Sequence, residues 1–358
     1  MNRSQPAWRF ALAAALVFFF GACAFAPCRA GAAAANATES PVPGSVLRSR
    51  PLDASVEERI LALDPEHISD SDVRSTLSAG PAPRIMLFHG GVYPVHLLME
   101  SFSRFLTGMG YPEERIRDAG DGRLSLSPYE SSDRQAGRIA WYYEREGVRP
   151  ILVGHSQGGI QVVKILHELA GSFRDSLHVF NPLTEEFEER TTILDPLTGR
   201  ERPAVGLSVA SASVVGTGGW ALALPVHWMV VSRVRSIPDT VDEFIGYRIG
   251  IDFFAWDGPG LEGVKTFYAA GKANVRNVTL PTEYSHVFVP VTAQLAEDPA
   301  VRDWINAFDP SNPVGAAPRP EGASNIMWAA DVWHSIKRHW ALEAQRFVRA
   351  RRTSAAAN

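Results

Sequence analysis

One short segment combines residue types that suit nucleophilic chemistry. Residues 154–158 read Gly-His-Ser-Gln-Gly, between a short apolar run at 151–153 and a helical pattern at 160–170. Glycines two positions either side of Ser156 avoid side-chain clashes in a sharp turn that projects the serine oxygen above a sheet. A serine activated there by a base attacks the carbonyl carbon of an ester or amide and forms a covalent acyl intermediate. The segment therefore predicts that Ser156 is a nucleophile.

The elements around this segment alternate between strand and helix. Apolar runs predict strands at 84–88, 151–153, 205–215, 244–251 and 275–280. Apolar residues at helical spacing predict helices at 55–63, 97–109, 131–146 and 160–170. Such alternation is typical of an α/β fold, with a mainly parallel central sheet flanked by helices.

The serine segment and a second motif give the chain a resemblance to a known superfamily. His89, Gly90 and Gly91 directly follow the predicted strand 84–88. Together with the Gly-x-Ser-x-Gly turn, they make residues 84–290 resemble the α/β-hydrolase superfamily, and more narrowly its bacterial lipase-like and esterase-like members. The resemblance implies an α/β-hydrolase fold, in which the nucleophile lies on the turn between a central strand and the following helix.

The resemblance also implies a base and an acid downstream of the nucleophile, in the chain order serine, acid, histidine. His286 lies in a loop after the last predicted strand, where the superfamily places its base. The acid normally follows the strand before that one, and Asp252 at the end of 244–251 fits best. The alternatives for the acid are Asp257, Asp239 and Asp242.

The same resemblance implies two backbone donors that stabilise an oxyanion. Gln157, the residue after the nucleophile, supplies one N–H, and the loop after the first strand supplies the other from Gly91 or its neighbour Gly90. His155 lies inside the serine turn, where its side chain is constrained away from the nucleophile. We therefore do not expect His155 to act as the base.

The first residues have the composition of an export signal. Arg3 and Arg9, an apolar run at 10–20 and small residues to position 35 predict a secretory signal peptide at 1–35, followed by a linker at 36–54. An uncleaved N-terminal anchor is one alternative, because the apolar stretch approaches the length of a spanning helix. Lipidation at Cys23, which follows Gly-Ala, is another. We expect an exported bacterial protein that is periplasmic, secreted or attached to the cell envelope.

Beyond this segment we expect one domain at 55–325, with an insertion at about 172–243 and a C-terminal helix within 326–358 packed on the domain. The residues from Trp220 to Val231 are strongly apolar and are interrupted by Pro225. They predict either a buried helix or a lid over a hydrophobic site.

Composition and the missing motifs argue against several classes of ligand. The 358-residue chain has a net charge of −4 and a pI near 6.2, so there is no electrostatic reason to expect a nucleic-acid partner. The sequence has no His-Glu-x-x-His, no Cys-x-x-Cys and no phosphate-binding loop. It therefore implies no metal and no cofactor.

These observations predict a serine hydrolase that cleaves carboxylic esters through an acyl-enzyme, with Ser156, His286 and Asp252 as its triad. The apolar segment at 220–231 favours lipophilic acyl esters as substrates. Acyl transfer, thioester hydrolysis and peptide cleavage on the same triad are alternatives, because one fold hosts all of these reactions. A non-catalytic cell-envelope protein that retains the scaffold is the alternative from another class.

Overall fold

The computed structural model describes residues 52–92, 95–256, 265–312, 317–318 and 325–356. All of them belong to one compact unit, Pro41–Asn358. The predictions for the signal peptide, most of the linker, Cys23 and Asp257 lie outside the described residues.

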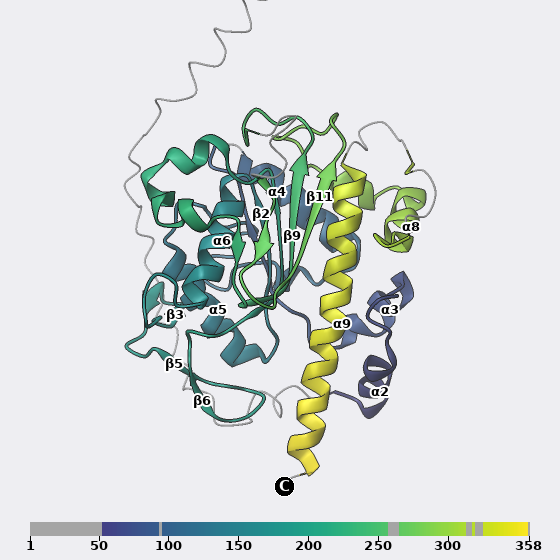
Figure 1. Cartoon of the computed structure of the whole chain (residues 1–358). Helices are drawn as coiled ribbons and strands as arrows, with labels where there is room; N and C mark the ends of the chain where they lie inside the picture. The colour runs from purple at the N-terminus through teal and green to yellow at the C-terminus, as the bar shows by residue number, and fades with distance from the viewer. Residues whose placement is uncertain (1–51, 93–94, 257–264, 313–316, 319–324, 357–358) are drawn as a thin grey trace, which may run out of the picture. The chain divides into compact units, whose positions relative to one another are not determined.

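A five-stranded parallel sheet forms the centre of this unit, with helices on both faces (Figure 1). This arrangement confirms the predicted α/β class and the mainly parallel central sheet. The strands lie in the sheet in the same order as in the chain, and each is hydrogen-bonded in parallel to its neighbours. They are β1 (Ile85–Phe88), β2 (Ile151–His155), β7 (Val209–Val215), β9 (Val241–Ile249) and β11 (Asn274–Leu280). The loops that follow these strands therefore share one edge of the sheet, the edge at which α/β proteins bind their ligands.

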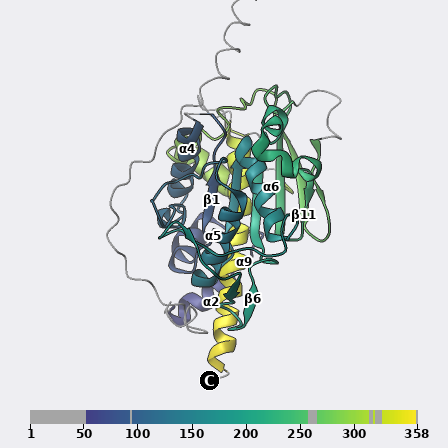
Figure 2. The same ribbon diagram turned by 90° about the vertical axis from the view of Figure 1, so that its left-hand side faces the viewer.

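The two faces of the sheet are covered by different helices. On one face Leu87 packs in a core with helices α4 (Val95–Gly108) and α9 (Ile326–Ala356). On the other face Met86 packs with α5 (Ser132–Glu146) and α6 (Gln157–Leu169). Figure 2 shows α4 and α6 on opposite sides of β1. Because both faces are covered, β1 and β2 are buried along their whole length, and residues 85–88 and 151–153 within them read as continuous apolar runs.

Shorter helices complete the unit. The predicted helix at 55–63 is α2 (Ala54–Ala62), and two further helices, α3 (Asp70–Ser75) and α8 (Pro299–Ala307), were not expected. The predicted C-terminal helix is α9, and its three tryptophans, Trp328, Trp333 and Trp340, are fully buried. Among the described residues, no helix has both the length and the apolar composition that crossing a membrane requires.

The span 172–243 needs a correction, because it contains β7 of the central sheet and is therefore not one continuous insertion. Its first part forms two small antiparallel pairs, β3 (Phe180–Asn181) with β4 (Glu186–Phe187) and β5 (Thr192–Leu194) with β6 (Glu201–Pro203). Its last part contains β8 (Ser236–Ile237), which pairs with β10 (Tyr268–Ala269), and the start of β9.

The apolar segment at 220–231 forms two 3₁₀ helices, η4 (Gly219–Ala223) and η5 (Pro225–Arg233). Trp220 is 59% exposed and Trp228 is 64% exposed, whereas His227 and Val230 are buried. The interpretation as a buried helix is therefore wrong. The exposed apolar side chains also include Met229 and Val231. The segment is attached to α6 through the Lys164 ammonium, which donates to the Val226 carbonyl at 3.0 Å.

Candidate active site

Ser156 lies on a strained turn between β2 and α6. Its φ of 55° and ψ of −118° are rare for a residue with a side chain, and strain of this kind persists only where the surroundings hold it. A Cβ on Gly158 would lie 2.1 Å from the Phe88 carbonyl oxygen, and one on Gly154 would lie 2.7 Å from the Gly158 carbonyl oxygen. Both contacts involve backbone, so the turn requires glycine at both positions.

A chain of hydrogen bonds connects Ser156 to His286 and Asp252. His286 Nε2 lies 2.9 Å from Ser156 Oγ, and His286 Nδ1 lies 2.6 Å from Asp252 Oδ2. The three residues come from the loops after β2, β11 and β9, all at one edge of the sheet. Because an ionised carboxylate only accepts, Nδ1 donates to Asp252, and Nε2 is then the acceptor for the serine proton.

Asp252 is buried, with 2% of its surface exposed. Its second oxygen, Oδ1, accepts the backbone N–H groups of Phe254 at 3.0 Å and Ala255 at 3.1 Å. These donors fix the carboxylate, so that one oxygen is committed to the loop and the other to His286. Burial of this group is tolerated because both oxygens have donors.

The other acid candidates have different surroundings or lie outside the described residues. Asp239 accepts backbone N–H groups of Lys272 and Ala273. Asp242 forms an ion pair with Arg149. Asp257 lies outside the described residues, so the structure brings only Asp252 of the described candidates to His286.

Gly91 and Gln157 lie together beside the serine turn. A Cβ on Gly91 would lie 1.7 Å from Gln157 Oε1, so the glutamine side chain packs directly on this glycine. The Tyr129 hydroxyl donates to the Gly91 carbonyl at 2.7 Å and holds the loop from its other end. Gln157 is the first residue of α6, and the N–H of such a residue has no acceptor within the helix. Its N–H is therefore suited to an external oxygen, as the prediction for an oxyanion site requires.

Two aromatic rings flank the imidazole of His286, and the sequence did not reveal either contact. The Phe254 ring stacks on it at a centroid distance of 5.1 Å and an interplanar angle of 29°. The His155 ring lies 5.2 Å from it at an angle of 48°. No periodicity or motif links these positions to residue 286, because the contacts join loops that are distant in the chain.

An exposed aromatic surface adjoins His286. Phe254 is 61% exposed and Phe253 is 82% exposed. Trp220 of η4 packs edge-on against Trp256 at 4.7 Å, and its backbone N–H donates to the Phe254 carbonyl at 3.4 Å. We call Trp220, Phe253, Phe254 and Trp256 the aromatic rim. Exposed aromatic side chains gathered in one place mark a surface for apolar ligands or partners.

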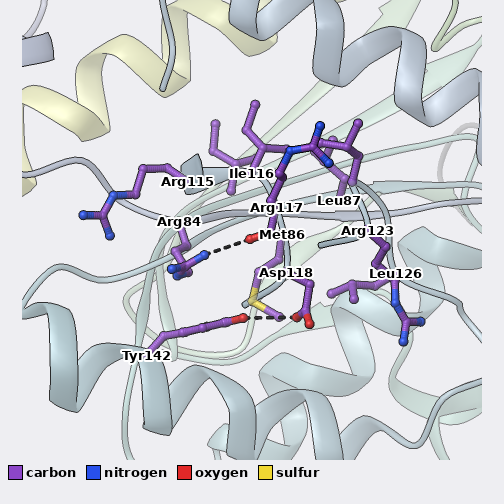
Figure 3. Close-up of a pocket in the computed structure, with 12 residues that line it drawn as sticks. Arg84, Met86, Leu87, Arg115, Ile116, Arg117, Asp118, Arg123, Leu126 and Tyr142 are labelled. Carbon is purple, nitrogen blue, oxygen red and sulfur yellow. Dashed lines mark hydrogen bonds between the residues drawn. The ribbon is translucent and has the colours of Figure 1, made fainter. Parts of the chain in front are cut away.

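Neither of two cavities in the described structure is lined by Ser156, His286 or Asp252. The first has a volume of about 10 Å³ and lies beside β1, where Tyr142 points to Asp118 (Figure 3). That volume holds about one water molecule and no substrate. The second, about 180 Å³, lies between β9, β11 and residues 265–267, with Arg235 and Arg248 in its wall. Across the described residues, no group of three or more His, Cys, Asp or Glu side chains is placed to hold a metal ion.

Comparison with known proteins adds no relative to this description. No protein-family model matches the chain, and neither does any curated protein. The geometry of the site therefore indicates its chemistry. A hydroxyl, an imidazole and a buried carboxylate are hydrogen-bonded in series, which is an arrangement that can transfer a proton from serine to histidine.

Proposed function

We propose that the protein is a serine hydrolase of the α/β-hydrolase fold that cleaves carboxylic esters. The observation that carries this proposal is the hydrogen-bonded series Ser156–His286–Asp252, with distances of 2.9 and 2.6 Å. Buried structural histidines are common, but this one joins a strained serine to a fully bonded carboxylate. Strain and pre-organised partners at one position favour a catalytic interpretation over a structural one.

The order of the strands supports the same fold. The nucleophile follows the second strand of the sheet, the acid follows the fourth and the base follows the fifth. This order of serine, acid and histidine along the chain is the one found in α/β-hydrolases. The Gly-x-Ser-x-Gly turn between β2 and α6 agrees with it.

In the first half of the proposed reaction, Ser156 Oγ attacks the ester carbonyl carbon while its proton moves to His286 Nε2. Asp252 stabilises the resulting imidazolium through Nδ1, and the N–H groups of Gln157 and Gly91 stabilise the oxyanion. The intermediate then collapses, the alcohol leaves with the proton from Nε2, and the acyl group remains on Ser156.

In the second half, water attacks the acyl-serine and His286 takes the proton from that water. Collapse of the second tetrahedral intermediate releases the carboxylic acid and returns the proton to Ser156 Oγ. The positive end of the α6 dipole favours the negative charge that develops in both halves, because Ser156 lies at the N-cap of that helix.

We propose lipophilic acyl esters as the substrate class. The aromatic rim borders the imidazole through Phe254, and an acyl chain that covers these rings removes apolar surface from water on both sides. Each buried methylene contributes about 0.8 kcal/mol. In this proposal η4, which carries Trp220, and η5 form a lid at the entrance to the active site.

The proposal includes export, on the basis of the N-terminal sequence alone. The charged start, the apolar run and the small residues up to position 35 indicate a signal peptide. Attachment to a membrane is the alternative fate of the same segment. Mass spectrometry of the mature N-terminus in the native cell distinguishes cleavage near position 35 from lipidation at Cys23.

A fluorescent alkylphosphonate that reacts with activated serines tests the proposed function. We expect it to label the purified wild-type protein once, on the peptide that contains Ser156. Ser156→Ala should abolish labelling, whereas Ser311→Ala, which changes an exposed serine elsewhere, should leave it unchanged. Labelling of Ser156→Ala at the wild-type level would show that another residue is the nucleophile.

A further inference from the structure

His155 is a buried histidine between the two loops that carry the base and the oxyanion donors. It is the last residue of β2, directly before Ser156, and only 1% of its surface is exposed. Its Nε2 lies 2.6 Å from the backbone carbonyl oxygen of His286. A Cβ on Gly90 would lie 3.2 Å from its Nδ1. The ring therefore fills the space between residue 286 and the loop after β1.

The bond to His286 determines where the proton of His155 resides. A carbonyl oxygen only accepts, so Nε2 carries the hydrogen and donates it. The other nitrogen, Nδ1, is buried and has no hydrogen-bond partner among the described residues. Among the described residues, His155 therefore makes its hydrogen bond through the Nε2–H, to the His286 carbonyl.

The charge state of His155 fits a role beside a base that becomes positive. Burial lowers the pKa of His155 to about 3, and the neighbouring imidazole of His286 acts on that pKa in the same direction. His155 therefore remains neutral when His286 takes up a proton. A second positive ring 5.2 Å away would oppose that protonation.

The loop that carries His286 depends on tethers from other elements. Ser285 and Phe288 are exposed. The Asn325 amide donates to the Phe288 carbonyl at 2.8 Å, and the Tyr284 hydroxyl accepts the Met327 N–H at 3.0 Å. Both of these tethers connect the loop to the start of α9. The bond from His155 connects it to the strand that carries the nucleophile.

We propose that His155 is a positioning residue, whose Nε2–H holds the backbone of His286 at a fixed distance from Ser156. The bond to Asp252 fixes the rotation of the imidazole, whereas the bond from His155 fixes the backbone from which that imidazole extends. Because residues 155 and 156 are consecutive, one tether sets the positions of base and nucleophile together. This inference rests on the proposed hydrolase function.

Two amide substitutions separate this role from simple packing. Gln at position 155 places its Nε2 donor near the position of the histidine Nε2, whereas the shorter Asn places its donor near that of Nδ1. Both side chains are polar and uncharged, but only Gln reaches the His286 carbonyl. The assay is hydrolysis of a soluble p-nitrophenyl ester by the full-length protein, with kcat and KM measured separately.

We expect His155→Asn to lower kcat by about 10- to 100-fold, because a displacement of about 1 Å costs this much in a positioned site. KM should stay within about twofold, since the aromatic rim is unchanged. His155→Gln should recover most of kcat. His334→Leu removes another histidine bond to a backbone carbonyl, that of Phe308, and serves as the control for general destabilisation with unchanged kcat.

A proton NMR spectrum supplies a readout that does not depend on turnover. The Nδ1–H of His286 that donates to Asp252 should give a far-downfield signal in the wild-type protein and in His155→Gln. In His155→Asn the signal should broaden or disappear, because the loop no longer holds the ring in place.

Equal kcat in His155→Asn and the wild type would overturn the inference, and so would equal losses in the Asn and Gln variants. A wild-type protein that fails to react with the phosphonate would instead contradict the proposed function. The NMR comparison would then still decide whether His155 positions His286.

Discussion

Replacing Asp252 by Asn should strongly reduce the proposed ester hydrolysis while leaving the loop that carries residue 252 intact. Oδ1 of Asp252 accepts the N–H groups of Phe254 and Ala255, so the Asn side chain retains its oxygen on that side. Its NH₂ group then faces Nδ1 of His286, where Oδ2 was 2.6 Å away. Two donors cannot share this position. The proton of His286 therefore moves to Nε2, which can no longer accept the proton of Ser156.

The expected loss follows from this change of tautomer. In serine proteases, the same change of the triad Asp to Asn lowers kcat by about 10⁴-fold, or about 5.5 kcal/mol of transition-state stabilisation. Only 2% of the Asp252 surface is exposed, so water cannot replace the missing acceptor. We expect Asp252→Asn to lower kcat by about 10³- to 10⁴-fold.

The assay is steady-state hydrolysis of p-nitrophenyl butyrate, with thermal unfolding followed in parallel. The unfolding temperature should change little in Asp252→Asn, because both loop bonds remain. Asp239→Asn is the matched control, since Asp239 also accepts backbone N–H groups but does not contact His286. If Asp252→Asn kept kcat within tenfold of the wild type, the expected shift of the His286 proton to Nε2 would be refuted. An equal loss in Asp239→Asn would do the same.

Three further predictions concern the turn, the aromatic rim and pH. Gly158→Ala should lower kcat by more than about 100-fold. The new Cβ would lie 2.1 Å from the Phe88 carbonyl oxygen and would push the serine turn away from the end of β1. A wild-type kcat in this variant would contradict the prediction. Phe254→Ala should lower kcat/KM more for long-chain than for acetyl p-nitrophenyl esters, and the difference should correspond to about 1–3 kcal/mol of transition-state stabilisation. An equal loss for both esters would contradict a role of Phe254 in acyl binding. Burial lowers the pKa of His227 to about 4 from the ordinary value of 6.5, so the unfolded chain binds the proton first as the pH falls. The protonation of His227 should therefore lower the free energy of unfolding by about 3 kcal/mol between pH 6.5 and about pH 4. Urea unfolding of His227→Leu should show a correspondingly flatter pH dependence, and an unchanged slope would refute this assignment.

The serine turn between β2 and α6 could be predicted because its signals are local. A strand, two glycines, a serine and a helix follow one another within about twenty residues, and each has its own sequence pattern. The short helices had local signals as well. Ser69 and Asp72 form a capping box on α3, and Asp298 followed by Pro299 starts α8. α3 has six residues, too few to show a convincing apolar periodicity, whereas α8 has nine, as many as the predicted α2, and was missed although its N-terminal signal is present.

The details of the site depend on contacts that sequence patterns do not encode. The apolar pattern of β9 continues to Ile251, but β9 ends at Ile249 and Ile251 is 49% exposed. Asp252 therefore lies in a loop, and only its backbone donors show why it is preferred over its neighbours. The bond between His155 and residue 286 joins positions 131 residues apart, so no local pattern predicts it.

The apolar segment shows a further limit of sequence patterns. Hydrophobicity alone does not distinguish a buried helix from an exposed rim, because both use the same residue types. Trp220 and Trp228 are exposed, whereas His227 and Val230 of the same segment are buried.

Trapping the acyl-enzyme shows directly whether Ser156 is the nucleophile. Mixing excess p-nitrophenyl ester with the protein and quenching in acid within milliseconds should give a burst of nitrophenol of up to about one equivalent. Peptide mass spectrometry of the quenched sample should find one acyl group, on Ser156. An acyl group on another residue, or steady turnover with no acylated peptide under conditions where deacylation is slow, would contradict the account.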